Sequence, residues 1–485
     1  MNTSNFSISL LKTIMVLIIF SSVNLGCNNN DEIFQKKISN QDIIKNKSTL
    51  KNRTISSDIK VMTYNTHLFL ITKYEDDIRQ TEVIKFLKQH SSTDIFVLTE
   101  VWTDASKRAI VQALNDTHPY FTHTENNGIV GDGLLIISKL PIHKQSFEKF
   151  KNSSGADALS QKGFWELEMA TKEGAGFYLY TTHLQADNDN FDIRSKQIDQ
   201  MLIKMNTKKD YPIILAGDLN IPTTGTEYTN NISSKLSFLK DPISQASKLF
   251  NTYDEVNNKL AQHFDTDKNV VEQSRLDYIL VSNTGNIEVF DNENKVFAPK
   301  YNSPRGGNNF DVSDHNPFQT KLKITTSKTS IPVNIYNSLD EAKTAVNKMK
   351  SNYGNGVSGL TIISNQTTKI LHLKKKTILE GGEFFTLPPS YIPSGKYGAY
   401  LVVHPQSEAL GVDSSIEYYI GSSQDFFSTK TIIPWGVASN KINGVINSVA
   451  SIKDNKTFSN QTNGYILEGN VSGGTSPNVN FIIKN

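Results

Sequence analysis

Cysteine is almost absent from this chain of 485 residues, since Cys27 is the only one. No disulfide can therefore form within the chain, and a zinc site built from several thiolates is excluded. An excess of charge of one sign is also lacking, with 50 Lys and Arg against 48 Asp and Glu. This balance disfavours a protein that holds nucleic acid mainly through a strong basic field.

Long apolar runs are scarce as well, and the run Thr13–Phe20 is too short for a comfortable membrane span. Lys12 precedes this run, and small and polar residues lead from it to Leu25-Gly26-Cys27, which is the layout of a secretory signal over residues 1–27. Leu-Gly-Cys also resembles a bacterial lipobox, which implies a lipid on the sulfur of Cys27. The alternative is a plain signal peptide with an incidental cysteine. Either interpretation predicts a protein that is secreted or lipid-anchored on the outside of a bacterial cell.

Changes in composition divide the rest of the chain into three parts. Residues 28–57 are rich in Asn, Lys, Ser and Asp and contain no Gly or Pro, which predicts a flexible linker. Residues 58–325 mix strand-like and helical patterns, which predicts a layered α/β domain. Residues 326–485 carry many short β-type runs between turns rich in Gly, Ser and Asn, as is typical of a β-sandwich.

Local patterns predict the main elements of these two domains. The spacing of apolar residues predicts helices over 77–90, 104–116, 191–206 and 338–353. The run "DGLLIISKLPI", residues 132–142, is expected to form one strand.

Polar residues lie at or near the ends of predicted strands in six places. They are Asn65 in "TYNTH", Glu100 in "LTEVW", His183 in "TTHLQA", Asp218 and Asn220 in "AGDLN", Asp277 in "RLDYILV", and Asp314-His315 in "VSDHNPF". Each cluster alone has an ordinary explanation as a turn, a solvated acid or a surface histidine. Their joint occurrence, each beside an apolar strand, favours a single functional site.

These residue types suit the hydrolysis of a phosphodiester. Glu and Asn oxygens fit a hard ion such as Mg²⁺, which would polarise the phosphate and neutralise the leaving oxygen. Asp218 and Asn220 are placed to orient a water and a phosphoryl oxygen. His315 is a candidate general base, because imidazole titrates near working pH, and His183 is a candidate donor to a developing negative oxygen. The sequence thus predicts in-line attack by water without a covalent intermediate.

The order Asn, Glu, His, Asp-x-Asn, Asp, Asp-His resembles the endonuclease/exonuclease/phosphatase superfamily. This resemblance implies a DNase I-like fold, a four-layer α-β-β-α sandwich, followed by a mainly β C-terminal domain. Within the superfamily, "HLQA" at residues 183–186 and "LSQKGFWELEM", with Lys162-Gly163, resemble the secreted bacterial neutral sphingomyelinases. The implied activity is Mg²⁺-dependent hydrolysis of sphingomyelin to ceramide and phosphocholine, which would make the protein a candidate haemolysin.

The same resemblance implies a role for each site residue. Glu100 is the main metal ligand with Asn65 beside it, and the ion is Mg²⁺, with Mn²⁺ or Co²⁺ as alternatives. The remaining roles are phosphate and water binding by Asp218 and Asn220, general base catalysis by His315, transition-state stabilisation by His183, orientation of His315 by Asp277, and a position close to the metal for Asp314.

Two other functions stay open, an exported nuclease or other phosphodiesterase of the same fold, and a surface protein that has lost activity but binds membranes. The expected partner is sphingomyelin or a related phospholipid at a membrane surface, without nucleic acid, and a monomer is expected. Phe297, Tyr301 and Phe310 either insert into a membrane or belong to an ordinary loop. The C-terminal aromatic residues from Tyr418 to Trp435 are expected to pack a core in preference to forming a belt at lipid headgroups.

Overall fold

The structure is a computed structural model. It describes residues 54–68, 74–122, 131–243, 251–264, 272–328, 334–380, 382–404, 411–436, 438–451 and 455–485. The predicted signal sequence, Cys27 and nearly all of the predicted linker lie outside the described residues. Within the described ranges, no helix is both long enough and apolar enough to cross a membrane.

Two sheets form the centre of the N-terminal domain. The first runs in the order β13-β17-β1-β2-β4-β3, and β14 also pairs with β17. Its strands are β1 (Ile55–Leu68), β2 (Ile95–Val101), β3 (Tyr120–Phe121), β4 (Leu135–Ser138), β13 (Ile287–Val289), β14 (Lys295–Val296) and β17 (Phe318–Thr326). The second sheet runs in the order β5-β6-β7-β8-β12-β9. Its strands are β5 (Ile142–Lys149), β6 (Gly163–Ala170), β7 (Gly176–His183), β8 (Ile213–Asp218), β9 (Leu239–Lys240) and β12 (Asp277–Ser282).

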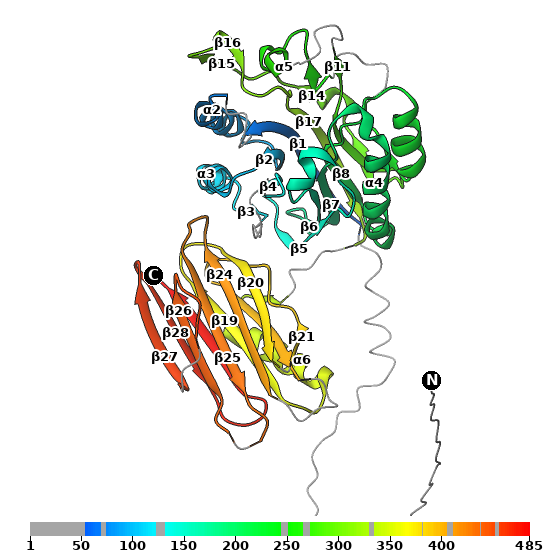
Figure 1. Cartoon of the computed structure of the whole chain (residues 1–485). Coiled ribbons are helices and arrows are strands. Elements are labelled where there is room, and N and C mark those ends of the chain that lie inside the picture. The colour runs from blue at the N-terminus through cyan, green and yellow to red at the C-terminus, as the bar shows by residue number, and fades with distance from the viewer. Residues whose placement is uncertain are drawn as a thin grey trace, which may run out of the picture. The chain divides into compact units, whose positions relative to one another are not determined.

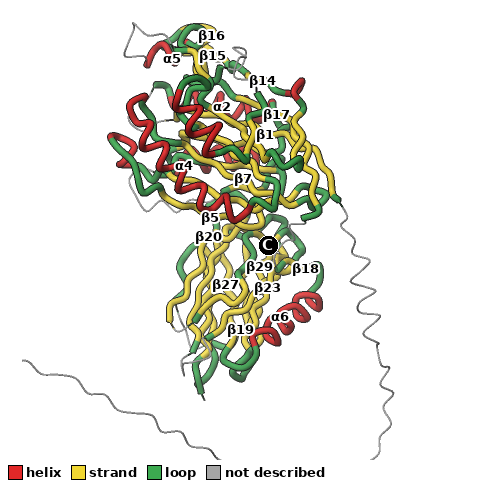
Figure 2. Tube along the Cα trace, turned by 90° about the vertical axis from the view of Figure 1, so that its right-hand side faces the viewer, coloured by secondary structure: helices red, strands yellow, loops and turns green. Residues whose placement is uncertain are grey.

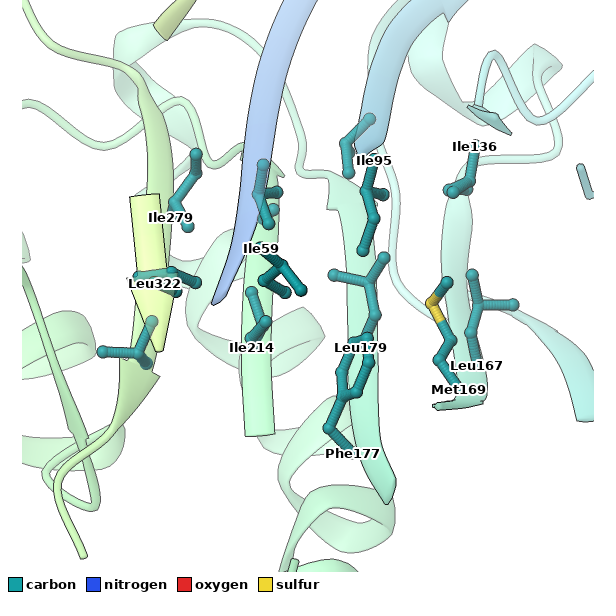
Figure 3. Close-up of a cluster of buried hydrophobic side chains, with 14 of the residues drawn as sticks. Ile59, Ile95, Ile136, Leu167, Met169, Phe177, Leu179, Ile214, Ile279 and Leu322 are labelled. Carbon is teal, nitrogen blue, oxygen red and sulfur yellow. The ribbon is translucent and has the colours of Figure 1, made fainter. Parts of the chain in front are cut away.

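Helices cover the outer face of each sheet, which makes four layers (Figure 1). Side chains of α2 (Asp76–Gln89) and α3 (Asp104–Leu114) share a core with the first sheet, and those of α4 (Phe191–Met205) share one with the second. A third core fills the space between the sheets, where Ile59 and Ile95 meet Leu179 and Ile214 (Figure 3). The strands alternate, so one face of each packs on the opposite sheet and the other on helices. This architecture confirms the predicted four-layer sandwich.

Two short ribbons and a short helix extend the N-terminal domain near the ends of the central strands. They are β10 (Tyr253–Asp254) with β11 (Gln273–Ser274), β15 (Lys300–Ser303) with β16 (Gly307–Asp311), and α5 (Lys259–Phe264).

The helix ends differ from the expected ones by no more than two residues, and two strand boundaries differ in ways that have a structural reason. The run predicted as a single strand over 132–142 is divided, because β4 ends at Ser138 in the first sheet and β5 begins at Ile142 in the second. Pro141 supplies no backbone N–H for a continuous ladder, so the chain changes sheet there. β1 begins at Ile55, earlier than the expected start of the domain, since Ser56 and Ser57 already pair with β17.

The C-terminal domain consists mainly of two further sheets, as expected. One runs in the order β18-β23-β19-β29-β28-β27 with β21 also on β23, and the other in the order β22-β20-β24-β25-β26. The strands are β18 (Ile335–Tyr336), β19 (Ser358–Gln366), β20 (Leu371–Glu380), β21 (Glu383–Thr386), β22 (Tyr391–Ile392), β23 (Tyr397–Val403), β24 (Val412–Ile420), β25 (Phe426–Ile433), β26 (Lys441–Ile446), β27 (Thr457–Thr462), β28 (Tyr465–Val471) and β29 (Asn478–Lys484). Helix α6 (Leu339–Tyr353) packs on the first of these sheets (Figure 2).

Four of the eight aromatic residues considered as membrane contacts are buried. Tyr301 and Phe310 are buried in the core beside α2, and Phe297 packs against that core. The segment before Asp314 forms the β15–β16 ribbon, and these three aromatic side chains pack against the protein core. In the C-terminal domain Tyr418 and Phe427 are fully buried, as core packing predicts, whereas Trp435 is 54% exposed.

Candidate active site

Strand register places three of the predicted site residues in a row across the second sheet. His183 at the end of β7 lies opposite Asp218 at the end of the parallel strand β8. Asp218 in turn lies opposite Asp277, which begins the antiparallel strand β12. Because residues paired in register point to the same face, these three side chains leave one end of the sheet together.

The first sheet brings Asn65 and Glu100 to the same place. β1 and β2 are parallel, with Asn65 opposite Thr99, so Glu100 follows directly. The Asn65 side-chain nitrogen Nδ2 donates to Glu100 Oε1 at 2.9 Å and to Asp218 Oδ2 at 2.9 Å. Asn65 thus joins the two sheets at the site. Its oxygen accepts from the backbone N–H of His67 at 3.0 Å, so in this arrangement Glu100 meets the amide nitrogen of Asn65.

A histidine that the sequence analysis did not select links Glu100 with Asp314. His67 Nδ1 lies 2.8 Å from Asp314 Oδ2 and 3.8 Å from Glu100 Oε2. Burial alone would lower the pKa of His67, but the Asp314 carboxylate outweighs it and raises that pKa. The only signal in the sequence was its spacing of two residues from Asn65 in "TYNTH".

His315 is held by a buried carboxylate. Its Nδ1 lies 2.7 Å from Asp277 Oδ2 and 3.8 Å from Asp218 Oδ2, and all three side chains are buried. Burial lowers the pKa of His315, yet Asp277 first and then Asp218 raise it well above its ordinary value. The contact orients the His315 ring and directs Nε2 away from Asp277.

His183 has the opposite electrostatic environment. Its Nε2 lies 3.8 Å from Asp218 Oδ2, 4.0 Å from Glu100 Oε1 and 3.3 Å from Lys162 Nζ. Burial first, and then the positive charges of Lys162 and His315, hold the pKa of His183 well below its ordinary value. The low pKa favours the neutral form of the His183 ring, and Lys162 also donates to Asp157 and to the carbonyl of Leu184.

The "AGDLN" stretch is a specialised strand end. Gly217 has φ 143°, and a Cβ there would meet the Thr182 carbonyl oxygen at 2.1 Å, so only glycine allows β7 and β8 to approach this closely. Asn220 has φ 50° and donates from Nδ2 to the carbonyl of Leu184 at 3.1 Å, while its N–H donates to Asp218 Oδ1 at 2.9 Å. The turn therefore fixes the rotamer of Asp218.

Two fully buried arginines support the loops that carry the site. Arg79 on α2 donates to the carbonyls of Thr66, His67 and Val312, which flank Asn65 on one side and Asp314 on the other. Arg194 on α4 donates to the carbonyls of Gln185 and Asp187 after His183, and pairs with both oxygens of Glu227. Helices on both outer faces thus reach the same end of the sandwich.

Replacing Arg194 with methionine is expected to lower the free energy of unfolding by roughly 3 kcal/mol, because the Glu227 carboxylate loses its buried partner. Chemical denaturation measures the change. Lys85→Met is the matched control, since it removes a cation that is 61% exposed and paired with Glu82 at the surface, and little change is expected. Equal stability of the two variants would contradict the structural role of Arg194.

The site concentrates negative charge in a buried place. Burial first, and then the neighbouring Asp277, raise the pKa of Asp218. Burial would also raise the pKa of Asp314, but His67 holds it below its ordinary value. Ligand atoms of Asp218, Asp277 and His315 lie within 4.8 Å of one another and form a group that could hold a metal ion. Together with Glu100 these carboxylates fit a divalent cation, which would relieve their mutual repulsion.

All eight residues that the sequence analysis selected therefore lie at one end of the sandwich. They are Asn65, Glu100, His183, Asp218, Asn220, Asp277, Asp314 and His315. The direct contacts of His67 and the buried ion pair of Lys162 add two residues to this set.

Comparison with known proteins identifies relatives of this chain. Sphingomyelinase C of Listeria ivanovii is 25% identical over 212 residues, which cover 37% of this chain and 63% of that protein. Sphingomyelinase C 2 of Leptospira interrogans serogroup Icterohaemorrhagiae serovar Lai is 28% identical over 213 residues, which cover 39% of this chain and 33% of that protein. The chain thus spans less than two thirds of the length of both. A solved beta toxin mutant from Staphylococcus aureus with bound magnesium ions is 19% identical, with a TM-score of 0.44, and the match covers 56% of this chain and 100% of that one.

Two family models match the two domains. The model described as Nakanori-like protein matches residues 327–485. The model described as Endonuclease/Exonuclease/phosphatase family matches residues 62–315, which is more than half of the chain and spans every residue of the site. The relatives and the Asp/Asp/His group support a metal-dependent phosphodiesterase of this fold. This protein belongs to the Endonuclease/Exonuclease/phosphatase family.

Proposed function

We propose that this protein is a Mg²⁺-dependent phospholipase C that hydrolyses sphingomyelin to ceramide and phosphocholine. The observation that carries the chemistry is the convergence of the His315–Asp277 pair and Asn65 on one carboxylate, Asp218, with the same Asn65 amide also bonded to Glu100. Curated relatives named sphingomyelinase C support the choice of sphingomyelin as the substrate. The sequence cues "HLQA" and "LSQKG" support the same choice.

The residues divide the work between the two sides of a bound phosphodiester. His315 accepts the proton of the attacking water, since Asp277 stabilises the imidazolium that forms. Asp218 and Asn220 orient that water and a phosphoryl oxygen. The pair His183 and Lys162 faces the developing negative charge, because the Lys162 ammonium lies within 3.3 Å of the neutral ring.

Glu100 is the residue that we propose as the main ligand of the cation, with Asp314 close to it. The hydrogen bond of 2.7 Å to His315 makes Asp277 an orienting group in preference to a ligand. The oxygen-rich donor set favours Mg²⁺, and Mn²⁺ or Co²⁺ would suit the same oxygens. When bound, the cation supplies charge neutralisation for the phosphate and the leaving oxygen.

Release of phosphocholine from sphingomyelin and from phosphatidylcholine, with and without EDTA, tests the proposal. We expect turnover of sphingomyelin that stops with EDTA and returns with Mg²⁺. Turnover that persists in EDTA would contradict the metal-dependent mechanism. Cleavage of DNA without turnover of sphingomyelin would make the protein a nuclease of the same family.

The pH profile provides a further prediction. The base must be neutral to act, so kcat/KM is expected to rise with pH through the raised pKa of His315. Asp277 is the largest cause of the raised pKa of His315. The acidic limb of the pH–rate profile should therefore move to lower pH in Asp277→Asn, while the maximum rate falls. Rates on sphingomyelin between pH 5 and 10 measure both effects, and an unchanged limb would argue against His315 as the base.

We extend the proposal to the setting of the enzyme. Residues 1–27 would export it, with Cys27 as the lipid attachment point if the lipobox is used. The substrate would be met at a membrane surface by a monomer, without nucleic acid as a partner. Release of haemoglobin from erythrocytes by the wild-type protein, in Mg²⁺ but not in EDTA, would support a haemolytic activity.

A further inference from the structure

Tyr253 lies directly beside the candidate base. The ring centroids of Tyr253 and His315 are 5.2 Å apart and their planes meet at 57°. A β-bridge joins the backbones of these two residues, and the N–H of Asn316 donates to the Thr252 carbonyl at 2.6 Å. The aromatic ring is therefore fixed at the reacting centre by the backbone on both sides.

Two carboxylates share the face of the ribbon that carries Tyr253. The pairing of Asp254 with Gln273 and the bond from Glu255 N to Glu272 O at 2.9 Å place Glu255 opposite Glu272. Because side chains alternate along a strand, Tyr253, Glu255 and Glu272 point to one side, and Asp254 points to the other. We call Tyr253, Glu255 and Glu272 the acidic wall.

Hydrogen bonds order this acidic wall. The Tyr253 hydroxyl donates to Glu255 Oε1 at 3.0 Å, and the Glu272 N–H donates to Glu255 Oε2 at 2.6 Å. Burial first, and then Glu255, raise the pKa of Glu272, whereas His315 lowers it. The acidic wall is thus electronegative and electrostatically coupled to the site. Like charges directly opposite each other on two strands destabilise a ribbon, and a cation between them would remove that cost.

We propose that the acidic wall is a subsite for the quaternary ammonium group of the substrate headgroup, an inference that rests on the proposed function. A quaternary ammonium cannot donate hydrogen bonds, so an aromatic face with nearby carboxylates is the environment that recognises it. The headgroup remains attached to phosphorus during attack by water, so its cation stays near the base throughout the reaction. The negative charge of the acidic wall disfavours lipids with anionic headgroups.

Two substrates, one with a positively charged headgroup and one without, test this inference on the full-length protein in Mg²⁺. The first is sphingomyelin in mixed micelles, and the second is bis(p-nitrophenyl) phosphate, which has no positive group. Glu272→Gln and Tyr253→Leu are expected to raise KM for sphingomyelin by about fivefold to twentyfold, as the loss of a desolvated cation–π or charge contact does. Because both residues also lie near His315, some loss on bis(p-nitrophenyl) phosphate is expected, but its kcat/KM should fall several times less than that for sphingomyelin.

Controls separate recognition from damage to the base. Tyr253→Phe keeps the ring and loses only the hydrogen bond to Glu255, so it should raise KM for sphingomyelin much less than Tyr253→Leu does. Glu288→Gln removes a carboxylate that is 63% exposed on β13 and should leave the kinetic constants for both substrates unchanged. Equal losses on both substrates, or no change in KM for sphingomyelin, would overturn the subsite. If the wild type released no phosphocholine at all, the proposed function itself would fail, which is a different result from active enzyme with unchanged variants.

Discussion

Replacing His315 with alanine is expected to lower kcat for phosphodiester hydrolysis by at least about a thousandfold, the upper range for loss of a general base. The expectation rests on its position, since Nδ1 is occupied by Asp277 at 2.7 Å and Asp218 lies at 3.8 Å. The removed ring is also the cation that faces these two buried carboxylates. Phosphocholine release at saturating sphingomyelin measures the change, and the thermal midpoint shows whether the variant is folded.

The outcome also separates an enzyme from an inactive membrane-binding protein. His315→Asn keeps a polar side chain next to Asp277 but cannot accept the proton, so it should be as inactive as His315→Ala. His90→Ala changes a histidine at the end of α2, outside the site, and should retain the wild-type rate. If the His315 variants lysed sphingomyelin membranes at the wild-type rate, lysis would come from binding alone.

Replacing Glu100 with glutamine is expected to weaken the binding of Mg²⁺ or Mn²⁺ by at least about a hundredfold, because loss of a direct ligand should exceed the effect of an outer-shell change. The substitution keeps the size and the acceptor for Asn65 while it removes one charge from the site. Titration calorimetry with each metal, without any substrate, measures the affinity. The hydrolysis rate at low metal concentration should fall in parallel.

The binding experiment also tests which carboxylates hold the ion. Asp277→Asn should leave metal affinity nearly unchanged if Asp277 only orients His315. A large loss of affinity in Asp277→Asn with little loss in Glu100→Gln would place the ion on the Asp218, Asp277 and His315 group instead. Glu288→Gln serves as the matched control, because its carboxylate pairs with Lys323 on the exposed side of β13.

The site residues at strand ends could be selected from the sequence because a polar residue beside an apolar run is a local pattern. Asp218 follows an apolar strand in "IILAGDLN", and the same rule placed His183 and Asp277 at ends of apolar strands. Parallel and antiparallel pairing in register then brought the three together, which the chain order alone does not reveal. The buried Tyr301 and Phe310 show the converse, since the sequence does not reveal whether an aromatic residue of a β-ribbon faces a core or a membrane.

The sequence by itself determined the fold class, the residue types of the site and the reaction class, because periodicity and the chemistry of side chains are local properties. Only the tertiary structure decided that His67 contacts Asp314, that Lys162 lies beside His183 and that Tyr253 stands against His315. These contacts join residues from different strands, loops and sheets. Their electrostatic effect depends on burial and on distances of a few ångströms, and neither quantity can be read from the order of the residues.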